Sequence, residues 1–230
     1  MVDAASAQTG AVSPGKVVVL YGDRLGPATL AGSQVSNGVL SNSLANAQVL
    51  FDGIPAPLLY SSAGQVAAIV PYAVDGQAGT QVTVKNGSVV SDKVALPVAA
   101  TAPGIFSANL SGAGQGAILN QDLTVNSSAN PAAAGSVVVI YATGEGQTTP
   151  AGIDGKLALG PVHPAPKAAV SVTIGGVAAE VLYAGAAPSL VAGVMQVNAR
   201  IPAGAVSGDN TVTVTVGAAA SQPGITVAVK

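Results

Sequence analysis

The chain has 230 residues, of which 49% are hydrophobic, 8% charged and 3% aromatic, and its formal net charge is -2. This composition excludes an intrinsically disordered tail, because disorder requires low hydrophobicity and a high density of charge. It also gives no basic surface for nucleic acids or anionic membranes, and the absence of cysteine excludes disulfides and thiolate metal sites.

Short segments rich in Val, Thr and Leu follow one another through the first hundred residues, each bounded by Gly, Pro, Asn or Asp. They are Lys16–Tyr21, Gln48–Asp52, Pro57–Ser61, Gln65–Val70, Thr80–Lys85 and Val89–Val98. Gln81–Lys85 alternates polar and apolar residues, which is typical of a strand with one face in a core. The dipeptide Asn86-Gly87 predicts a hairpin. No stretch has apolar residues at helical spacing over three turns, so we expect an all-β sandwich.

The same series of segments occurs twice. Blocks of the first half match blocks of the second half in the same order: Gly15–Tyr21 with Gly135–Tyr141, Val49–Gly53 with Val172–Gly176, Leu59-Tyr60 with Leu182-Tyr183, Gln65-Val66 with Gln196-Val197, Val70-Pro71 with Ile201-Pro202, and Val82–Val84 with Val212–Val214. Chance similarity would not keep this order, so the chain holds two homologous modules.

The repeat divides the chain into three parts. We expect a first sandwich at residues 1–100, an ordered linker at residues 101–134 with an added strand near Gly116–Asn120, and a second sandwich at residues 135–230. A long loop follows the first strand of each module, at Gly26–Asn46 and at Gly144–Ala168. Loops above about 12–15 residues are uncommon and often functional.

Several blocks resemble known domains. Gly15–Gly26, Val49–Ala56 and Val70-Pro71 resemble the IPT/TIG type of immunoglobulin-like domain. Four further segments resemble an uncharacterised paralogous domain at the C-termini of large secreted acidobacterial proteins: Ala102–Phe106, Gly114–Gln121, Tyr141–Gly144 and Ala178–Gly185. The resemblance runs from Val2 to Val229. It implies two tandem immunoglobulin-like (IPT/TIG-type) β-sandwiches and a secreted or cell-surface location, and it brings no catalytic residues.

The ionisable residues are few and scattered. His163, the only histidine, lies between prolines in a loop, where we expect it to be exposed, and one histidine cannot supply the ligands that a metal needs. Glu145 and Asp154 share the long loop of the second module and are the pair of acids that we expect to converge, if any do. Lys16 begins a strand and is expected to be solvated. Gly112–Gly116 lacks the spacing of a dinucleotide-binding loop. We therefore predict no catalytic residue, no cofactor and no metal.

Four of the five tyrosines repeat with the modules. The pairs are Tyr21 with Tyr141 and Tyr60 with Tyr183. Repetition at matched strand ends predicts structural anchors, with the ring buried and the hydroxyl bonded. Tyr72 has no counterpart, and it joins Glu145, Asp154 and His163 as a candidate interaction residue.

These features predict a non-catalytic extracellular structural or adhesion-type module, a spacer or interaction domain whose partner is another protein or a second copy. The chain has no Gly-x-Ser-x-Gly elbow, and one histidine is a poor basis for nucleophilic catalysis. The start, Met1–Ser6, lacks the basic and apolar regions of a signal peptide, so we expect no signal sequence in this chain.

Two alternatives remain open. The first is a self-assembling subunit of an extracellular filament or surface layer, formed by sandwich packing or by exchange of Met1–Ala11 or Ile225–Lys230, because few charges protect the sheet edges. The second is a carbohydrate-binding module. A ligand, such as a glycan, is expected on the two long loops or in the cleft between the modules.

Overall fold

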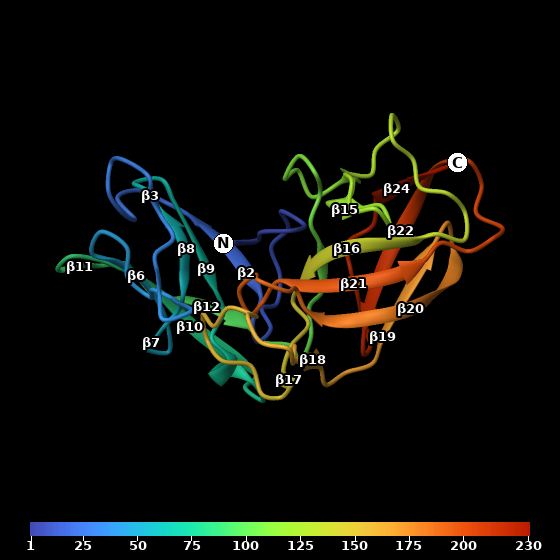
Figure 1. Ribbon diagram of the computed structural model, residues 1–230. Coiled ribbons are helices and arrows are strands. Elements are labelled where there is room, and N and C mark those ends of the chain that lie inside the picture. Colours follow the sequence, from blue (N-terminus) through green and yellow to red (C-terminus); the bar gives the residue numbers. More distant parts are fainter.

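The computed structural model describes residues 1–230, and almost all of its regular structure is β (Figure 1). The one helical segment is a 3₁₀ turn, η1 (Tyr72–Val74). Nothing helical in the chain has the length and hydrophobicity needed to cross a membrane. Two separate apolar cores lie in the two halves of the chain, so the predicted all-β fold with two tandem sandwiches is confirmed.

The first module is a sandwich of two sheets. One sheet has the order β1 (Val2–Asp3), β2 (Val17–Tyr21), β9 (Gln65–Ile69), β8 (Leu58–Ser61) and β3 (Ala31–Gly32). The other has the order β11 (Val89–Val90), β10 (Gly79–Asn86), β6 (Ala47–Phe51) and β7 (Ile54–Pro55), with β12 (Val94–Pro97) also paired with β10. Alternate residues point into the core: in β6, Ala47, Val49 and Phe51 are buried while the residues between them are half-exposed.

The second module forms one continuous sheet that folds over its own core. Its order is β13 (Gly104–Ile105), β16 (Val137–Thr143), β21 (Met195–Arg200), β20 (Val177–Ala186), β19 (Val170–Ile174), β22 (Gly208–Val216), β24 (Ile225–Val229) and β14 (Gly114–Gln115). Two further strands, β15 (Ile118–Leu119) and β23 (Ala219–Ala220), pair with β16 and β22. Short strands in the loops complete the fold: β4 (Val35–Ser36), β5 (Val39–Leu40), β17 (Thr148–Thr149) and β18 (Ala165–Pro166).

The continuity of the second sheet depends on β20. The start of this strand pairs with β19 and the rest pairs with β21, so it carries the chain from one layer to the other. In the first module the matching segment is broken into β7 and β8, with Pro55 and Pro57 where β20 has Ala178 and Glu180. Proline has no N–H to donate to a ladder, which explains the break.

The two modules share several local details. A bulge interrupts the ladder between β8 and β9 at Leu59, and another interrupts that between β20 and β21 at Leu182. The predicted hairpin after β10 is present, but its two loop residues are Gly87 and Ser88, because Asn86 still pairs with Val89. Gly87 has φ +61° and the matching Gly217 has φ +62°.

The expected strand Val89–Val98 is divided into β11 and β12. Between them the Ser91 hydroxyl accepts a hydrogen bond from the Val84 N–H (2.9 Å), so a side chain takes the place of a ladder carbonyl. The second module repeats this contact between Ser221 and Val214 (3.1 Å).

The modules lie side by side, with the first at the left of Figure 1 and the second at the right. The two terminal segments suggested for exchange between copies, Met1–Ala11 and Ile225–Lys230, have partners within the chain. Strand β1 pairs with β2, and β24 pairs with β22 and β14. Between residues 101 and 134, β13, β14 and β15 pair with strands of the second module. The module boundaries near residues 100 and 134 stay a prediction.

Candidate functional site

A third apolar cluster lies between the modules. Val17, Leu40 and Ile69 of the first module pack with Val191 of the second, and all four are buried. Leu157, from the long loop of the second module, packs against them. We call these residues the intermodule cluster. It is continuous with neither module's core, so the apolar faces of two sandwiches are buried against each other.

Hydrogen bonds surround the intermodule cluster. The Val17 N–H donates to the Thr143 hydroxyl (2.9 Å), which in turn donates to the Gly193 carbonyl (2.7 Å). The Ser13 hydroxyl donates to the Gly144 carbonyl (3.2 Å). Because these groups are buried, their pairing removes the desolvation cost that an unpaired group would carry.

The two long loops predicted to bind ligands contact each other. The Leu40 N–H donates to the Gly155 carbonyl, and the Leu157 N–H donates to the Gly38 carbonyl, both at 2.8 Å. Val39 and Lys156 form an antiparallel bridge. The matched loops of the repeat therefore join the modules to each other, which limits their freedom to close on a ligand.

The interface also contains three of the four candidate interaction residues. Tyr72 is 6% exposed, Glu145 is 2% exposed and Asp154 is half-buried. The Tyr72 N–H donates to Asp154 Oδ1 (2.8 Å), and the Tyr72 ring lies against Gly152, where no side chain would fit. Tyr72 is therefore a buried part of the interface, and our expectation of an available ligand contact there was wrong.

The two acids stand in an environment that disfavours charge. Burial raises the pKa of Glu145 from 4.5 to about 8, and one of its oxygens, Oε2, has no hydrogen-bond partner. Burial also raises the pKa of Asp154, while the Tyr72 N–H acts in the opposite direction. Burial and then the charges of Glu145 and Asp154 raise the pKa of Tyr72 far above its ordinary range.

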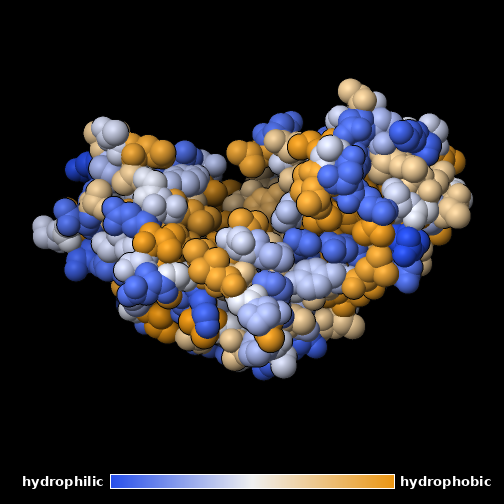
Figure 2. All heavy atoms as spheres, in the orientation of Figure 1, coloured by the Kyte–Doolittle hydropathy of each residue, from blue (hydrophilic) through white to orange (hydrophobic).

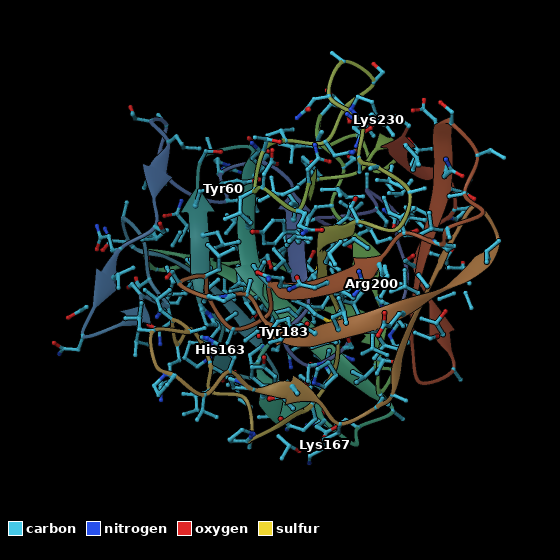
Figure 3. All side chains as sticks on the ribbon, turned by 45° about the vertical axis from the view of Figure 1, so that its right-hand side comes forward. Tyr60, His163, Lys167, Tyr183, Arg200 and Lys230 are labelled. Atoms are coloured by element: carbon cyan, nitrogen blue, oxygen red, sulfur yellow. The ribbon has the colours of Figure 1, made fainter.

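His163, the fourth candidate, lies on the long loop of the second module (Figure 3). It is half-buried rather than exposed, and its Nδ1 atom has no hydrogen-bond partner. Its neighbours Val162 and Pro164 line an apolar pocket of about 320 Å³ formed by both long loops. No group of three or more His, Cys, Asp or Glu side chains stands where it could hold a metal ion.

Lys16 is buried, which contradicts the expectation of a solvated strand end. Its ammonium forms an ion pair with Asp3 (2.9 Å) and donates to the carbonyl of Ala102 (3.0 Å). Asp3 also accepts from the Ala5 N–H (2.7 Å). The pair thereby joins the N-terminal strand β1, the start of β2 and the segment that leads into the second module. Two charges can be buried here because each is paired and hydrogen-bonded.

A second site feature is an apolar cleft beside the intermodule cluster. Tyr21 and Tyr60 of the first module and Phe106 and Leu110 from beyond residue 100 line a hollow of about 370 Å³. We call it the aromatic cleft. Figure 2 shows the surface hollowed between the modules, with hydrophobic residues gathered around the hollow.

The aromatic cleft corrects our expectation for the repeated tyrosines. Tyr21 is 63% exposed and Tyr60 is half-buried, and neither hydroxyl makes a hydrogen bond within the chain. Burial and then the nearby Tyr21 raise the pKa of Tyr60. Of the four, only Tyr183 has the expected hydroxyl bond, to the Ala186 carbonyl (2.6 Å), and its ring is half-buried rather than buried.

One sequence signal for the interface was overlooked. In the matched blocks, Ile69 of the first module corresponds to Arg200 of the second. The two residues occupy the same register position, but one is apolar and the other is charged. This difference indicates that the face is buried in the first module and exposed to solvent in the second.

Comparison with solved structures gives distant similarities. SGBP-B of the Bacteroides ovatus mixed-linkage glucan utilization locus, solved in complex with a mixed-linkage heptasaccharide, has 16% identity and a TM-score of 0.38 over 99% of this chain and 47% of that chain. The full extracellular region of plexin A4 has 15% identity and a TM-score of 0.30, over 96% of this chain and 15% of that chain. Domains 5-6 of the S-layer protein SbsC have 15% identity and a TM-score of 0.29, over 96% and 93%.

This chain spans about half the length of the Bacteroides ovatus protein chain. No curated protein matches the sequence significantly. The family comparison is specific to the first module: residues 2–98 match the IPT/TIG domain.

Proposed function

We propose that the protein is a non-catalytic extracellular module whose two sandwiches, at residues 1–100 and 135–230 with the ordered linker 101–134, act as one rigid unit. Such a unit serves as a spacer or interaction domain of a secreted or cell-surface protein. The observation that carries this proposal is the intermodule cluster, in which apolar side chains of both modules are buried together.

The interface has the properties of a permanent contact. It combines a buried apolar centre with buried backbone and hydroxyl hydrogen bonds, such as the one between Val17 and Thr143. Interfaces between domains that move are usually more polar. A rigid pair of modules keeps a fixed distance and orientation between whatever is attached at its two sides, which is what a spacer requires.

The IPT/TIG match of residues 2–98 supports the extracellular assignment, since such domains are typical of extracellular proteins. The resemblance of the remaining segments to the C-terminal domain of secreted acidobacterial proteins supports it further. The buried ionisable groups support a structural rather than a catalytic role. Lys16 and Asp3 form an ion pair with each other, and Glu145 is buried in the interface.

Self-assembly is the second candidate function, and one observation favours it. Strand β12 pairs with β10 along one edge, and on its other edge only its last residue, Pro97, is bonded, by the Val12 N–H (3.0 Å), while its first residue, Val94, is 53% exposed. An unpaired strand edge is a template for another chain. Exchange of the terminal segments has less support, because β1 and β24 would first have to leave their partners within the chain.

Small-angle X-ray scattering of the full chain, together with light scattering, tests the proposal. We expect a monomer whose scattering profile fits one arrangement of the modules. A profile that requires modules moving independently would contradict the rigid unit, and concentration-dependent filaments would favour self-assembly. A panel of esters, glycosides and peptides supplies the enzymatic control: turnover that disappears in Glu145→Gln would contradict the non-catalytic assignment.

A further inference from the structure

The aromatic cleft gathers three of the seven Tyr and Phe residues of the chain: Tyr21, Tyr60 and Phe106. Its volume of about 370 Å³ falls within the range of about 300–1,000 Å³ that is usual for small-molecule sites. Exposed aromatic residues are costly to leave in water, and a monomer rarely groups them without a use. The cleft therefore has the size and the aromatic lining of a ligand site.

The duplicated module provides an internal comparison for this surface. In the second copy, the Tyr183 hydroxyl donates to the Ala186 carbonyl (2.6 Å), and the Gln196 amide donates to Asn198 (2.9 Å). The matching residues of the first copy are Tyr60 and Gln65, which both line the cleft and have no side-chain hydrogen bond in the chain. The polar side chains at these positions are therefore hydrogen-bonded within the second copy, whereas those of the first copy are available to a ligand. Tyr60 and Tyr183 are labelled in Figure 3.

The polar groups of the cleft are neutral. Two phenol hydroxyls and one amide can donate and accept hydrogen bonds. The only ionised residue in the lining is Asp3, and its charge is paired with Lys16 at 2.9 Å. An anionic or cationic ligand would find no opposite charge to compensate its desolvation.

A matching ligand has an apolar face to stack on aromatic rings and neutral hydroxyls around its edge. Pyranose sugars have this form, because their axial C–H groups make one face apolar while their hydroxyls project from the rim. A hydrophobic peptide would satisfy the walls but leave Tyr60, Tyr21 and Gln65 without partners, at a cost in free energy. We propose that the aromatic cleft binds a neutral oligosaccharide, with Tyr21 as the stacking surface and Tyr60 and Gln65 as hydrogen-bonding groups.

This inference goes beyond the proposed rigid unit, which would stand with the cleft empty. The two proposals can fail separately, because the scattering profile measures the arrangement of the modules, whereas calorimetric titration measures binding in the cleft.

Isothermal titration calorimetry of the full chain with neutral hexasaccharides tests the proposal, using β-1,4-glucan, β-1,3-glucan, α-1,4-glucan, mannan and xylan fragments as probes. We expect at least one to bind. Tyr21→Ala should then weaken binding by about tenfold or more, since it removes the stacking surface, and Tyr21→Phe should retain most of it. Gln65→Leu should weaken binding while keeping the apolar wall.

The matched control is Tyr141→Ala, which changes the corresponding position of the second module. It should leave the affinity unchanged within about twofold, and circular dichroism should show that both alanine variants are folded. Absence of binding by all five probes at millimolar concentration would overturn the proposal. So would equal binding by Tyr21→Ala and the parent, or preference for a hydrophobic peptide over every sugar.

Discussion

The two modules use the same strand positions in opposite ways. In the first, Val17 and Ile69 stand opposite each other on β2 and β9, and both are buried in the intermodule cluster. In the second, the matching pair is Val137 and Arg200, and the Arg200 guanidinium forms an exposed ion pair with Glu180 (2.8 Å).

The same contrast extends to the bulge. Leu59, the extra residue of the first module, packs against the intermodule cluster, whereas its counterpart Leu182 is 47% exposed. The matching sheet face is therefore a docking face in the first module and a solvated face in the second. The difference teaches that the fold alone does not create the interface; a few substitutions at fixed register positions create it.

Replacing Ile69 of the first module by arginine, the residue at the matching position of the second, should break the interface between the modules. Ile69→Arg places an unpaired charge where the parent side chain is 1% exposed, and we expect the free energy of unfolding to fall by about 4 kcal/mol or more. Urea titration followed by circular dichroism measures it. The reverse change, Arg200→Ile, removes an exposed ion pair with Glu180 and an exposed hydrogen bond to the Gly135 carbonyl (3.1 Å), and it should alter stability by less than about 1 kcal/mol. Equal losses in the two variants would contradict the comparison.

The buried ion pair distinguishes the copies in a second way, because Lys16 corresponds to Ser136. Lys16→Met leaves Asp3 as a buried unpaired charge, and we expect a loss of about 3–5 kcal/mol. The double variant Lys16→Met, Asp3→Leu should recover most of that loss, since it removes both charges. If the single variant is as stable as the parent, the pair does not hold the N-terminal strand in place.

Glu145 should make the interface sensitive to pH. Below pH 4.5 the folded and unfolded chains both hold its proton. Between pH 4.5 and about 8 the unfolded chain releases that proton while the folded chain keeps it, so the native state loses stability as pH rises, by at most about 1.4 kcal/mol per pH unit. Glu145→Gln should therefore be more stable than the parent by about 2 kcal/mol or more at pH 8, with no gain at pH 4.

The control for this prediction is Glu180→Gln, which changes an exposed acid. It should shift stability by less than about 1 kcal/mol across the same pH range. A pH-independent difference between Glu145→Gln and the parent would show that the Glu145 carboxyl is solvated, contrary to the structure.

A smaller effect on stability is expected at Gly193, where the backbones of the two modules approach each other closely. A methyl group at Gly193 would overlap the Gly15 carbonyl of the first module and press on Ile69. Gly208 has a similar φ, +111° against +106° at Gly193, but open space around it. Gly193→Ala should therefore cost about 1–3 kcal/mol more than Gly208→Ala, the difference being the intermodule overlap. Equal costs would mean that the modules are not in contact at this point.

Much of the fold could be predicted from the sequence, because local patterns determine it. Alternation in β10, the glycine of its hairpin and the order of the repeated blocks all act within a few residues or within one module. The break between β7 and β8 was readable from Pro55 and Pro57 as well, although the continuous β20 of the second module was not expected.

The site was harder to predict, because the exposure of each of its side chains depends on whether the other module covers that side chain. Tyr21 and Tyr141 occupy matching positions of β2 and β16, yet only Tyr21 is largely exposed. Lys16 gave no sign of burial, since its partner Asp3 reaches it through the N-terminal strand. The shared loop indicated Glu145 and Asp154 as candidates. It gave no sign of Tyr72, a residue of the other module whose N–H bonds Asp154 and whose pKa both acids raise.

The central claim is that the two sandwiches are one unit, and differential scanning calorimetry of the full chain tests it most directly. Two independent modules unfold in two steps, whereas a shared interface couples them. We predict a single transition with equal calorimetric and van't Hoff enthalpies, which divides into two in Ile69→Arg. Two separate transitions in the parent chain, unchanged by that substitution, would contradict the claim.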